Sequence, residues 1–362
     1  MKNNMLLISL FSIALLGCAD AGTKSDKANA AAAKTASSEA FTGANSRLIG
    51  RFDRNTNGQA KFTWPGSAIE FRFEGSKASI NIASQAKTRF AVTIDGKTTD
   101  LWTEAGNHTY VLASNLGSGT HTLRLTRLNE STAGVTSFIS DPQVDGKLLS
   151  PPQTPEKQLL VIGDSITAGY GVEGASEACH YTLDTSNQQL TYAALAASAL
   201  GADLHAIAWS GIGAWRSYGE KTPTNPTILT RHTRTLADDT TSVWNPSQYQ
   251  PDAILINIGT NDYWEGSTSD DYRLNMAKLI AQIQTDYKSK PIYLIVSPML
   301  TNKVHAAQKQ VLDGLAVGNV KVLDLGEGPG SDGLGCDYHP NSKTHARLGK
   351  VLEKNLKADL KW

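Results

Sequence analysis

The sequence has few cysteines, no surplus of either charge and no long hydrophobic run. Its 34 lysines and arginines are matched by 34 aspartates and glutamates. A nucleic-acid binder needs a basic surplus to neutralise phosphates, so we expect no nucleic-acid partner. Three cysteines in 362 residues are too few to build a disulfide scaffold. No stretch reaches the ~20 apolar residues of a membrane-spanning helix.

The remaining composition is that of an ordinary globular protein. Hydrophobic residues make up 40% of the chain, which is enough to build a core and too much for a disordered protein. At ~150 residues per domain, the length predicts about two domains. The 8 histidines show no ligand spacing such as H-E-x-x-H, so we expect no metal. Residues 169–174 match G-x-G-x-x-G but do not directly follow a predicted strand, so we expect no dinucleotide or other cofactor.

The amino-terminal segment is typical of an export signal. Lys2 precedes an apolar run from Met5 to Leu16, whose length fits the hydrophobic region of a signal peptide over residues 1–17. The run leads into Leu-Leu-Gly-Cys, ending at Cys18. This ending resembles the bacterial lipobox, which implies that Cys18 is acylated. The alternative is ordinary secretion with an unmodified cysteine.

Residues 18–45 are rich in Ala, Lys, Ser, Thr and Gly. Because few large apolar side chains occur here, the segment cannot offset the entropy cost of ordering. We therefore expect a lipidated, flexible linker. The lipobox resemblance has Ala19 and not Asp after the cysteine, which implies an outer-membrane lipoprotein, facing the periplasm or the cell surface. The lipid anchor would then be the only membrane contact.

Residues 46–150 show a period of two in hydrophobicity. Apolar residues alternate with polar ones in short runs separated by Gly, Asn and Asp, as at Ile69, Phe71 and Phe73. Such runs predict the antiparallel strands of a β-sandwich or jelly roll. The pair Pro151-Pro152 then marks a domain boundary.

Residues 156–362 show a different pattern. Apolar runs with few polar breaks occur at 159–162, 207–209, 253–258, 292–296 and 320–325, and helical patterns at 190–200, 272–287 and 343–360. Apolar runs of this kind suit strands buried on both faces of a parallel sheet. The alternation predicts a three-layer α/β domain, with helices on both sides of the sheet.

Four short motifs follow predicted strands of this second domain. They are Gly-Asp-Ser-Ile at Ser165, Ser-Gly at Gly211, Gly-Thr-Asn-Asp at Asn261, and Asp-Tyr-His-Pro at His339. Sites in open α/β sheets lie at the carboxyl ends of strands, so these residues can converge. A serine, two amide donors and a histidine are the parts needed for acyl transfer.

The order of these motifs resembles that of the SGNH, or GDSL-type, hydrolases, whose sheet is flavodoxin-like, and the resemblance covers about residues 158–362. It implies that Ser165 is the nucleophile and His339 the base. It also implies an oxyanion hole formed by the N–H groups of Ser165 and Gly211 and by the Asn261 side chain. A sandwich ahead of this domain, with the sequence GCDYHPN around the histidine, is similar to the family-two carbohydrate esterases, which remove acetyl groups from polysaccharides such as xylan.

One departure from the wider SGNH pattern concerns the acid that orients the histidine. That acid lies three residues before the histidine in the pattern, where this chain has Cys336; Asp337 is two before it. We therefore expect a Ser165–His339 dyad, in which either the Asp337 carboxylate or a backbone carbonyl holds Nδ1–H. A dyad suffices chemically, because the third member mainly fixes tautomer and orientation.

Other residues near the motifs have a structural and a functional interpretation. Trp215 and Trp264 lie close in sequence to two of the motifs, so they either pack in the core or stack on a sugar ring. Once Cys18 is lipidated, Cys179 and Cys336 remain as a pair. In an exported protein this pair predicts a disulfide, and two buried free thiols are the alternative.

The sequence thus predicts an esterase that acts on an acetylated polysaccharide or oligosaccharide. Two alternatives stay open. The same chemistry could serve lipid, thioester or peptidoglycan esters, or the chain could be a glycan-binding lipoprotein whose site has lost its activity. The sandwich domain would either complete the substrate cleft or bind glycan itself.

Overall fold

The computed structural model describes residues 40–54, 58–328 and 330–362. The predicted signal peptide, the predicted lipidation at Cys18 and most of the predicted linker lie outside these residues. In the described part of the chain, no helix combines the length and apolarity needed to cross a membrane.

The period-two segments form two antiparallel sheets of a sandwich, as predicted. One sheet has the order β1-β3-β8-β5-β6, with β11 beside β3, and the other β10-β4-β9-β2, with β7 beside β4. The alternating residues Ile69, Phe71 and Phe73 are all fully buried between the sheets. The strand bounds are β1 Ser46–Ile49, β2 Ala60–Phe62, β3 Ala68–Glu74, β4 Ala78–Ser84, β5 Thr88–Ile94, β6 Lys97–Thr103, β7 Gly106–Ala113, β8 Thr120–Arg127, β9 Thr136–Phe138, β10 Gln143–Val144 and β11 Lys147–Leu148.

The second half of the chain forms a parallel sheet with the order β13-β12-β14-β15-β16. Every residue of β14 and β15 is buried, which explains their unbroken apolar sequences. The strand predicted at residues 207–209 is longer in the structure, where β13 begins at Asp203 and ends at Ala208. The strand bounds are β12 Gln158–Gly163, β13 Asp203–Ala208, β14 Ala253–Asn257, β15 Ile292–Val296 and β16 Val320–Asp324.

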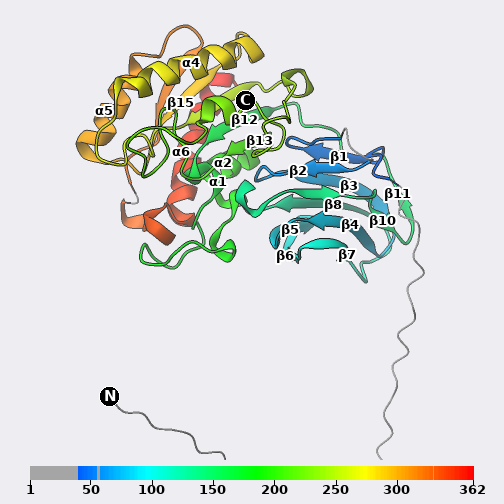
Figure 1. Ribbon diagram of the computed structural model, residues 1–362. Coiled ribbons are helices and arrows are strands. Elements are labelled where there is room, and N and C mark those ends of the chain that lie inside the picture. Colours follow the sequence, from blue (N-terminus) through cyan, green and yellow to red (C-terminus); the bar gives the residue numbers. More distant parts are fainter. Residues whose placement is uncertain (1–39, 55–57, 329) are drawn as a thin grey trace, which may run out of the picture. The chain divides into compact units, whose positions relative to one another are not determined.

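Helices cover both faces of this sheet, so the predicted three-layer α/β class is confirmed (Figure 1). Successive strand residues point to opposite faces. Leu160 and Ile162 therefore pack in one core with α4, while Leu159 and Val161 pack in the other with α2 and α6. The helix bounds are α1 Ser165–Ala168, α2 Tyr192–Leu200, α3 Ile228–Arg231, α4 Asp270–Tyr287, α5 Asn302–Asp313 and α6 Ser342–Leu360.

The sandwich packs directly on the α/β part through buried polar contacts. Arg47 on β1 forms an ion pair with Asp203, the first residue of β13. The Gly50 N–H donates to Nε2 of the buried His205 at 2.9 Å. The Ala237 N–H donates to Oγ1 of Thr63 at 2.9 Å. The two halves are therefore held together by polar contacts between their side chains and backbone groups.

Candidate active site

The structure brings Ser165 and His339 together, although 174 residues separate them in sequence. Ser165 opens α1, directly after β12, and is only 5% exposed. Its hydroxyl lies 2.7 Å from Nε2 of His339. Gly163 makes the sharp turn at the strand end feasible, because a Cβ there would lie 2.0 Å from Oγ1 of Thr167. A serine hydroxyl and an imidazole nitrogen are thus in hydrogen-bond contact at the carboxyl end of the sheet.

The second nitrogen of the imidazole fixes its tautomer. Nδ1 of His339 lies 2.9 Å from the backbone carbonyl of Asp337. A carbonyl oxygen can only accept, so Nδ1 carries the proton and Nε2 is left free to accept from Ser165. Burial lowers the pKa of His339, which keeps the ring neutral at physiological pH.

The Asp337 carboxylate does not take the part of an orienting acid, and that alternative from the sequence is wrong. Its oxygens accept from the Tyr181 N–H at 2.8 Å, from the Tyr170 hydroxyl at 2.8 Å and from His180 Nδ1 at 2.9 Å. The reason is backbone conformation. Asp337 and Tyr338 have left-handed φ angles of 51° and 62°, which direct the carbonyl toward His339 while the side chain points to the 180–181 segment.

This unusual turn is held in place by covalent and hydrogen bonds. Cys336 forms a disulfide with Cys179. The Asp337 N–H donates to the Cys179 carbonyl at 2.9 Å, and the Cys336 N–H donates to the Gly171 carbonyl at 3.1 Å. Cys336, which stands at the position of the acid in the wider SGNH pattern, thus anchors the turn in which the Asp337 carbonyl orients His339.

The other two predicted oxyanion donors, Gly211 and Asn261, lie in the loops that follow β13 and β14, the two strands that flank β12. Gly211 has φ +79°, which favours glycine. Among the residues that the structure describes, no acceptor pairs with the N–H of Ser165 or of Gly211. Asn261 is 6% exposed and donates one side-chain N–H to the Ile212 carbonyl at 2.8 Å. Its second side-chain N–H is left for another acceptor, as the predicted oxyanion hole requires.

Two motif aspartates, Asp164 and Asp262, shape these loops through hydrogen bonds to backbone N–H groups. Asp164 caps α1 by accepting from the Ile166 N–H at 3.0 Å. Asp262 accepts from the N–H groups of Ala214, Trp215 and Arg216 at 2.9, 2.7 and 3.1 Å. Burial raises the pKa of Asp164 to about 7 and that of Asp262 to about 6. Through its three hydrogen bonds, Asp262 joins the loop after β14 to the loop after β13.

The predicted tryptophans lie around a buried arginine. The Arg216 guanidinium lies 4.9 Å from the Trp215 ring and 5.6 Å from the Trp264 ring. Trp264 Nε1 donates to the Glu220 carbonyl at 3.2 Å, so this hydrogen bond also fixes the orientation of the indole. Both tryptophans are half-buried, which leaves part of each ring uncovered.

Two exposed tyrosines near the catalytic motifs were not singled out from the sequence. Tyr218 is 69% exposed, contacts Trp264 edge to face, and donates its N–H to the Gly211 carbonyl at 2.8 Å. Tyr338, directly before His339, is 67% exposed. Neither lies in a hydrophobic pattern, and although the sequence places Tyr338 next to His339, the exposure of both rings is known only from the structure.

Tyr170 was missed for the same reason. Its ring lies 4.3 Å from the His339 ring on one side and 4.3 Å from the Tyr181 ring on the other. Its hydroxyl donates to the Asp337 carboxylate, and burial raises its pKa well above the ordinary value. Tyr170 therefore restrains both the ring and the turn of the candidate base.

The sandwich also supplies a buried acid close to this site. Glu130 is 2% exposed, and burial raises its pKa to about 7, against the opposing influence of the neighbouring Ser210. The buried Ser210 hydroxyl has no hydrogen-bond partner among the described residues. Ser210 directly precedes Gly211, so Glu130 lies near one of the predicted oxyanion donors.

Comparison with known proteins agrees with this geometry. Residues 48–152 match the family model "Carbohydrate esterase 2 N-terminal", and residues 161–347 match the "GDSL-like Lipase/Acylhydrolase family". The chain is 33% identical over 323 residues to the cellulase/esterase CelE of Acetivibrio thermocellus, covering 86% of this chain and 39% of CelE. It is 27% identical to an acetylxylan esterase/glucomannan deacetylase of Cellvibrio japonicus, over 82% of this chain and 84% of that protein.

Solved structures give the same relationship. A family two carbohydrate esterase from Clostridium thermocellum, in complex with cellohexaose, matches with a TM-score of 0.84 and 31% identity, over 88% of this chain and 99% of that one. A carbohydrate esterase family 2 enzyme from Corynascus thermopiles matches with a TM-score of 0.78 and 32% identity, over 88% and 100%. The chain therefore belongs to the GDSL-like lipase/acylhydrolases and, within them, to the family-two carbohydrate esterases.

Proposed function

We propose that this protein is a serine esterase that removes O-acetyl groups from a polysaccharide. The observation that carries the proposal is the chain of contacts from Ser165 Oγ to His339 Nε2 at 2.7 Å and from Nδ1 to the Asp337 carbonyl at 2.9 Å. This arrangement supplies a nucleophile, a neutral base in the required tautomer, and a fixed ring orientation.

The proposed reaction is a two-step acyl transfer. Ser165 Oγ attacks the acetyl carbonyl as its proton passes to His339 Nε2. The N–H groups of Ser165 and Gly211 and the free N–H of Asn261 bind the oxyanion. The sugar hydroxyl leaves with the proton from His339, and water then attacks the acetyl-serine by the same route, releasing acetate and restoring Ser165.

The polysaccharide substrate is supported by the relatives and by the aromatic groups beside the site. One relative is named acetylxylan esterase/glucomannan deacetylase, and a related structure holds cellohexaose. Tyr218 and Tyr338 are exposed, and Trp264 is half-exposed next to Tyr218. Sugar rings pack on aromatic faces, so these residues provide a platform for a xylan-like chain beside the catalytic motifs.

We further propose that the enzyme is exported as a lipoprotein anchored through Cys18. The lipobox at the end of the apolar segment supports this proposal. Metabolic labelling with a fatty-acid analogue in a bacterial host should mark the wild type and leave Cys18→Ser unmarked. Equal labelling of the two proteins would contradict the proposed anchor.

The substrate proposal is tested by acetate release from acetylated xylan, acetylated peptidoglycan and p-nitrophenyl acetate, and by fatty-acid release from a lysophospholipid. We expect release from xylan and from the small ester, and none after Ser165→Ala. Release from the small ester alone would support the proposed esterase chemistry and reject the polysaccharide as substrate. Turnover of none of them by the wild type would reject the esterase altogether.

A further inference from the structure

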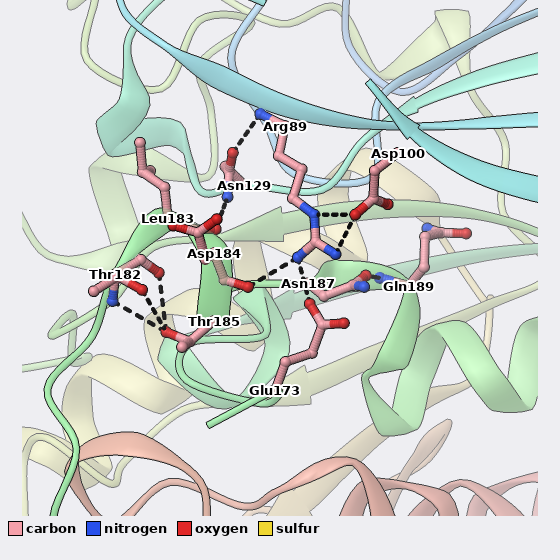
Figure 2. Close-up of polar contacts among 10 residues, drawn as sticks. All are labelled: Arg89, Asp100, Asn129, Glu173, Thr182, Leu183, Asp184, Thr185, Asn187 and Gln189. Carbon is pink, nitrogen blue, oxygen red and sulfur yellow. Dashed lines mark hydrogen bonds and ion pairs between the residues drawn. The ribbon is translucent and has the colours of Figure 1, made fainter. Parts of the chain in front are cut away.

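The sandwich reaches the α/β part through Arg89 on β5, which is 9% exposed. Figure 2 shows its guanidinium between groups of both parts. Within the sandwich, Nε and Nη2 donate to the Asp100 carboxylate at 2.9 and 2.6 Å. Toward the α/β part, Nη1 donates to the Glu173 carboxylate at 2.5 Å and to the Asp184 carbonyl at 2.9 Å. One side chain thus connects a sandwich strand to two points of a single loop.

The loop that Arg89 contacts runs from Glu173 to Asn187, and we call it the bridging segment. It is tied to itself, because the Glu173 N–H donates to the Thr185 carbonyl at 3.1 Å. Asn129 of the sandwich adds a second contact, since its amide donates to the Leu183 carbonyl at 2.8 Å (Figure 2). Asn129 in turn accepts from the Arg89 N–H at 2.5 Å. The sandwich therefore holds the bridging segment through adjoining groups.

The other side of the bridging segment holds the turn that orients His339. Cys179 forms the disulfide with Cys336, and its carbonyl accepts from the Asp337 N–H at 2.9 Å. The Tyr181 N–H donates to the Asp337 carboxylate at 2.8 Å. Every one of these contacts fixes Asp337, whose carbonyl lies 2.9 Å from His339 Nδ1. A continuous series of contacts thus runs from the sandwich to the imidazole.

We propose that Arg89 is a positioning residue for His339 and acts through the bridging segment, so that the sandwich is a working part of the catalytic site. The inference rests on the proposed esterase function. It gives the sandwich a role that does not require glycan binding. A displacement of a catalytic group by ~1 Å can cost ~100-fold in rate, so a less firmly held bridging segment should lower kcat measurably.

Arg47 offers a matched control. It is also a sandwich arginine, 12% exposed at its side chain, and forms ion pairs with Glu70 of its own part and Asp203 of the α/β part. Asp203 begins β13, so this contact lies at the opposite end of the sheet from Ser165. Loss of either arginine weakens the packing of the two parts, but only Arg89 contacts the bridging segment.

The test compares Arg89→Ala with Arg47→Ala in the full chain, using p-nitrophenyl acetate, which needs no extended sugar site. For Arg89→Ala we expect kcat to fall by about 10- to 100-fold, with KM changed by no more than about 2-fold. The kinetic pKa of the base should rise toward the ordinary histidine value, because burial holds the pKa of His339 down. Arg47→Ala should keep kcat and the kinetic pKa while lowering the melting temperature.

Two further variants test the proposal even if Arg89→Ala fails to fold. Glu173→Gln removes the charge but keeps a hydrogen-bond acceptor, so we expect a smaller fall in kcat. Arg89→Lys should restore part of the rate, because one contact to the bridging segment can re-form. Equal kcat and an unchanged kinetic pKa in Arg89→Ala and Arg47→Ala would overturn the proposal. A wild type without esterase activity, or an active Ser165→Ala, would instead overturn the proposed function.

Discussion

His339 Nδ1 is 2.9 Å from the backbone carbonyl of Asp337, and the carboxylate of the same aspartate faces away, toward the Tyr181 N–H. A carbonyl can hold the imidazole in one tautomer, but it brings no negative charge to stabilise an imidazolium. The proposed enzyme therefore depends on the shape of the turn and not on an acid. This shape is set by the disulfide of Cys336 and by the contacts of Tyr170.

The carboxylate of Asp337 should accordingly be dispensable for general-base catalysis. Asp337→Asn keeps the backbone carbonyl, tolerates the left-handed φ and retains an acceptor for Tyr181. We expect kcat to fall by no more than about 10-fold, whereas the equivalent change of a true triad acid costs about 10⁴-fold. His339→Gln is the matched comparison and should abolish turnover. A loss in Asp337→Asn as deep as in His339→Gln would show that the carboxylate itself is required.

The pH dependence of kcat/KM should report the buried imidazole. Burial lowers the pKa of His339, and only its neutral form accepts the Ser165 proton. Activity should rise with pH through a midpoint below the ordinary histidine value of about 6.5 and then stay level. Initial rates with p-nitrophenyl acetate across the acid range measure this midpoint. A midpoint above the ordinary value would contradict the buried, uncharged base.

Asn261→Ala should lower kcat by about 10²- to 10³-fold, the usual cost of one oxyanion donor. KM should change little, because the donor acts mainly on the developing negative charge. The same substitution removes the hydrogen bond to the Ile212 carbonyl, so thermal melting must show that the variant remains folded. A folded variant with unchanged kcat would remove Asn261 from the oxyanion hole.

Glu130 makes stability depend on pH in a predictable direction. Burial raises its pKa to about 7 in the folded protein, whereas an unfolded glutamate titrates near 4.3, the approximate model-peptide value. The folded state thus retains a proton that the unfolded state releases, so this group's contribution to stability falls as pH rises through that window. Glu130→Gln should raise the melting temperature at about pH 8 and change it less at about pH 5.

The control for that comparison is Glu177→Gln, on an exposed part of the bridging segment. It should leave the melting temperature unchanged at both pH values. If Glu130→Gln destabilises the protein equally at both, the Glu130 carboxyl is needed as an ion, and the neutral form beside Ser210 is not the folded state.

Much of the fold could be predicted from hydrophobic patterns, because those patterns reflect burial directly. The strand Ile292–Val296 was predicted to the residue. Helix α5 was missed because the buried polar residues His305 and Gln308 interrupt the apolar face that Val304, Val311 and Leu312 pack against the core. Polar side chains on the buried face of a helix weaken the apolar periodicity by which it is recognised in the sequence.

Within the site, the motif residues could be predicted and their orientation could not. Ser165, Gly211, Asn261 and His339 follow strand ends, so the topology of a parallel sheet brings them together. The choice between carboxylate and carbonyl depends on the left-handed backbone of Asp337 and Tyr338, which has no sequence signature at a non-glycine residue. Contacts between distant segments, such as that of Arg89 with Glu173, are equally invisible to any local pattern.

The central claim is that Ser165 carries the acetyl group during turnover. The most direct measurement is rapid acid quench of the enzyme during turnover of p-nitrophenyl acetate, followed by intact-mass and peptide mass spectrometry. The account predicts a mass increase of one acetyl group, located on the peptide that contains Ser165 and absent from Ser165→Ala, which should also be inactive. Undiminished turnover by Ser165→Ala, with no acetyl adduct on the wild type, would contradict the account.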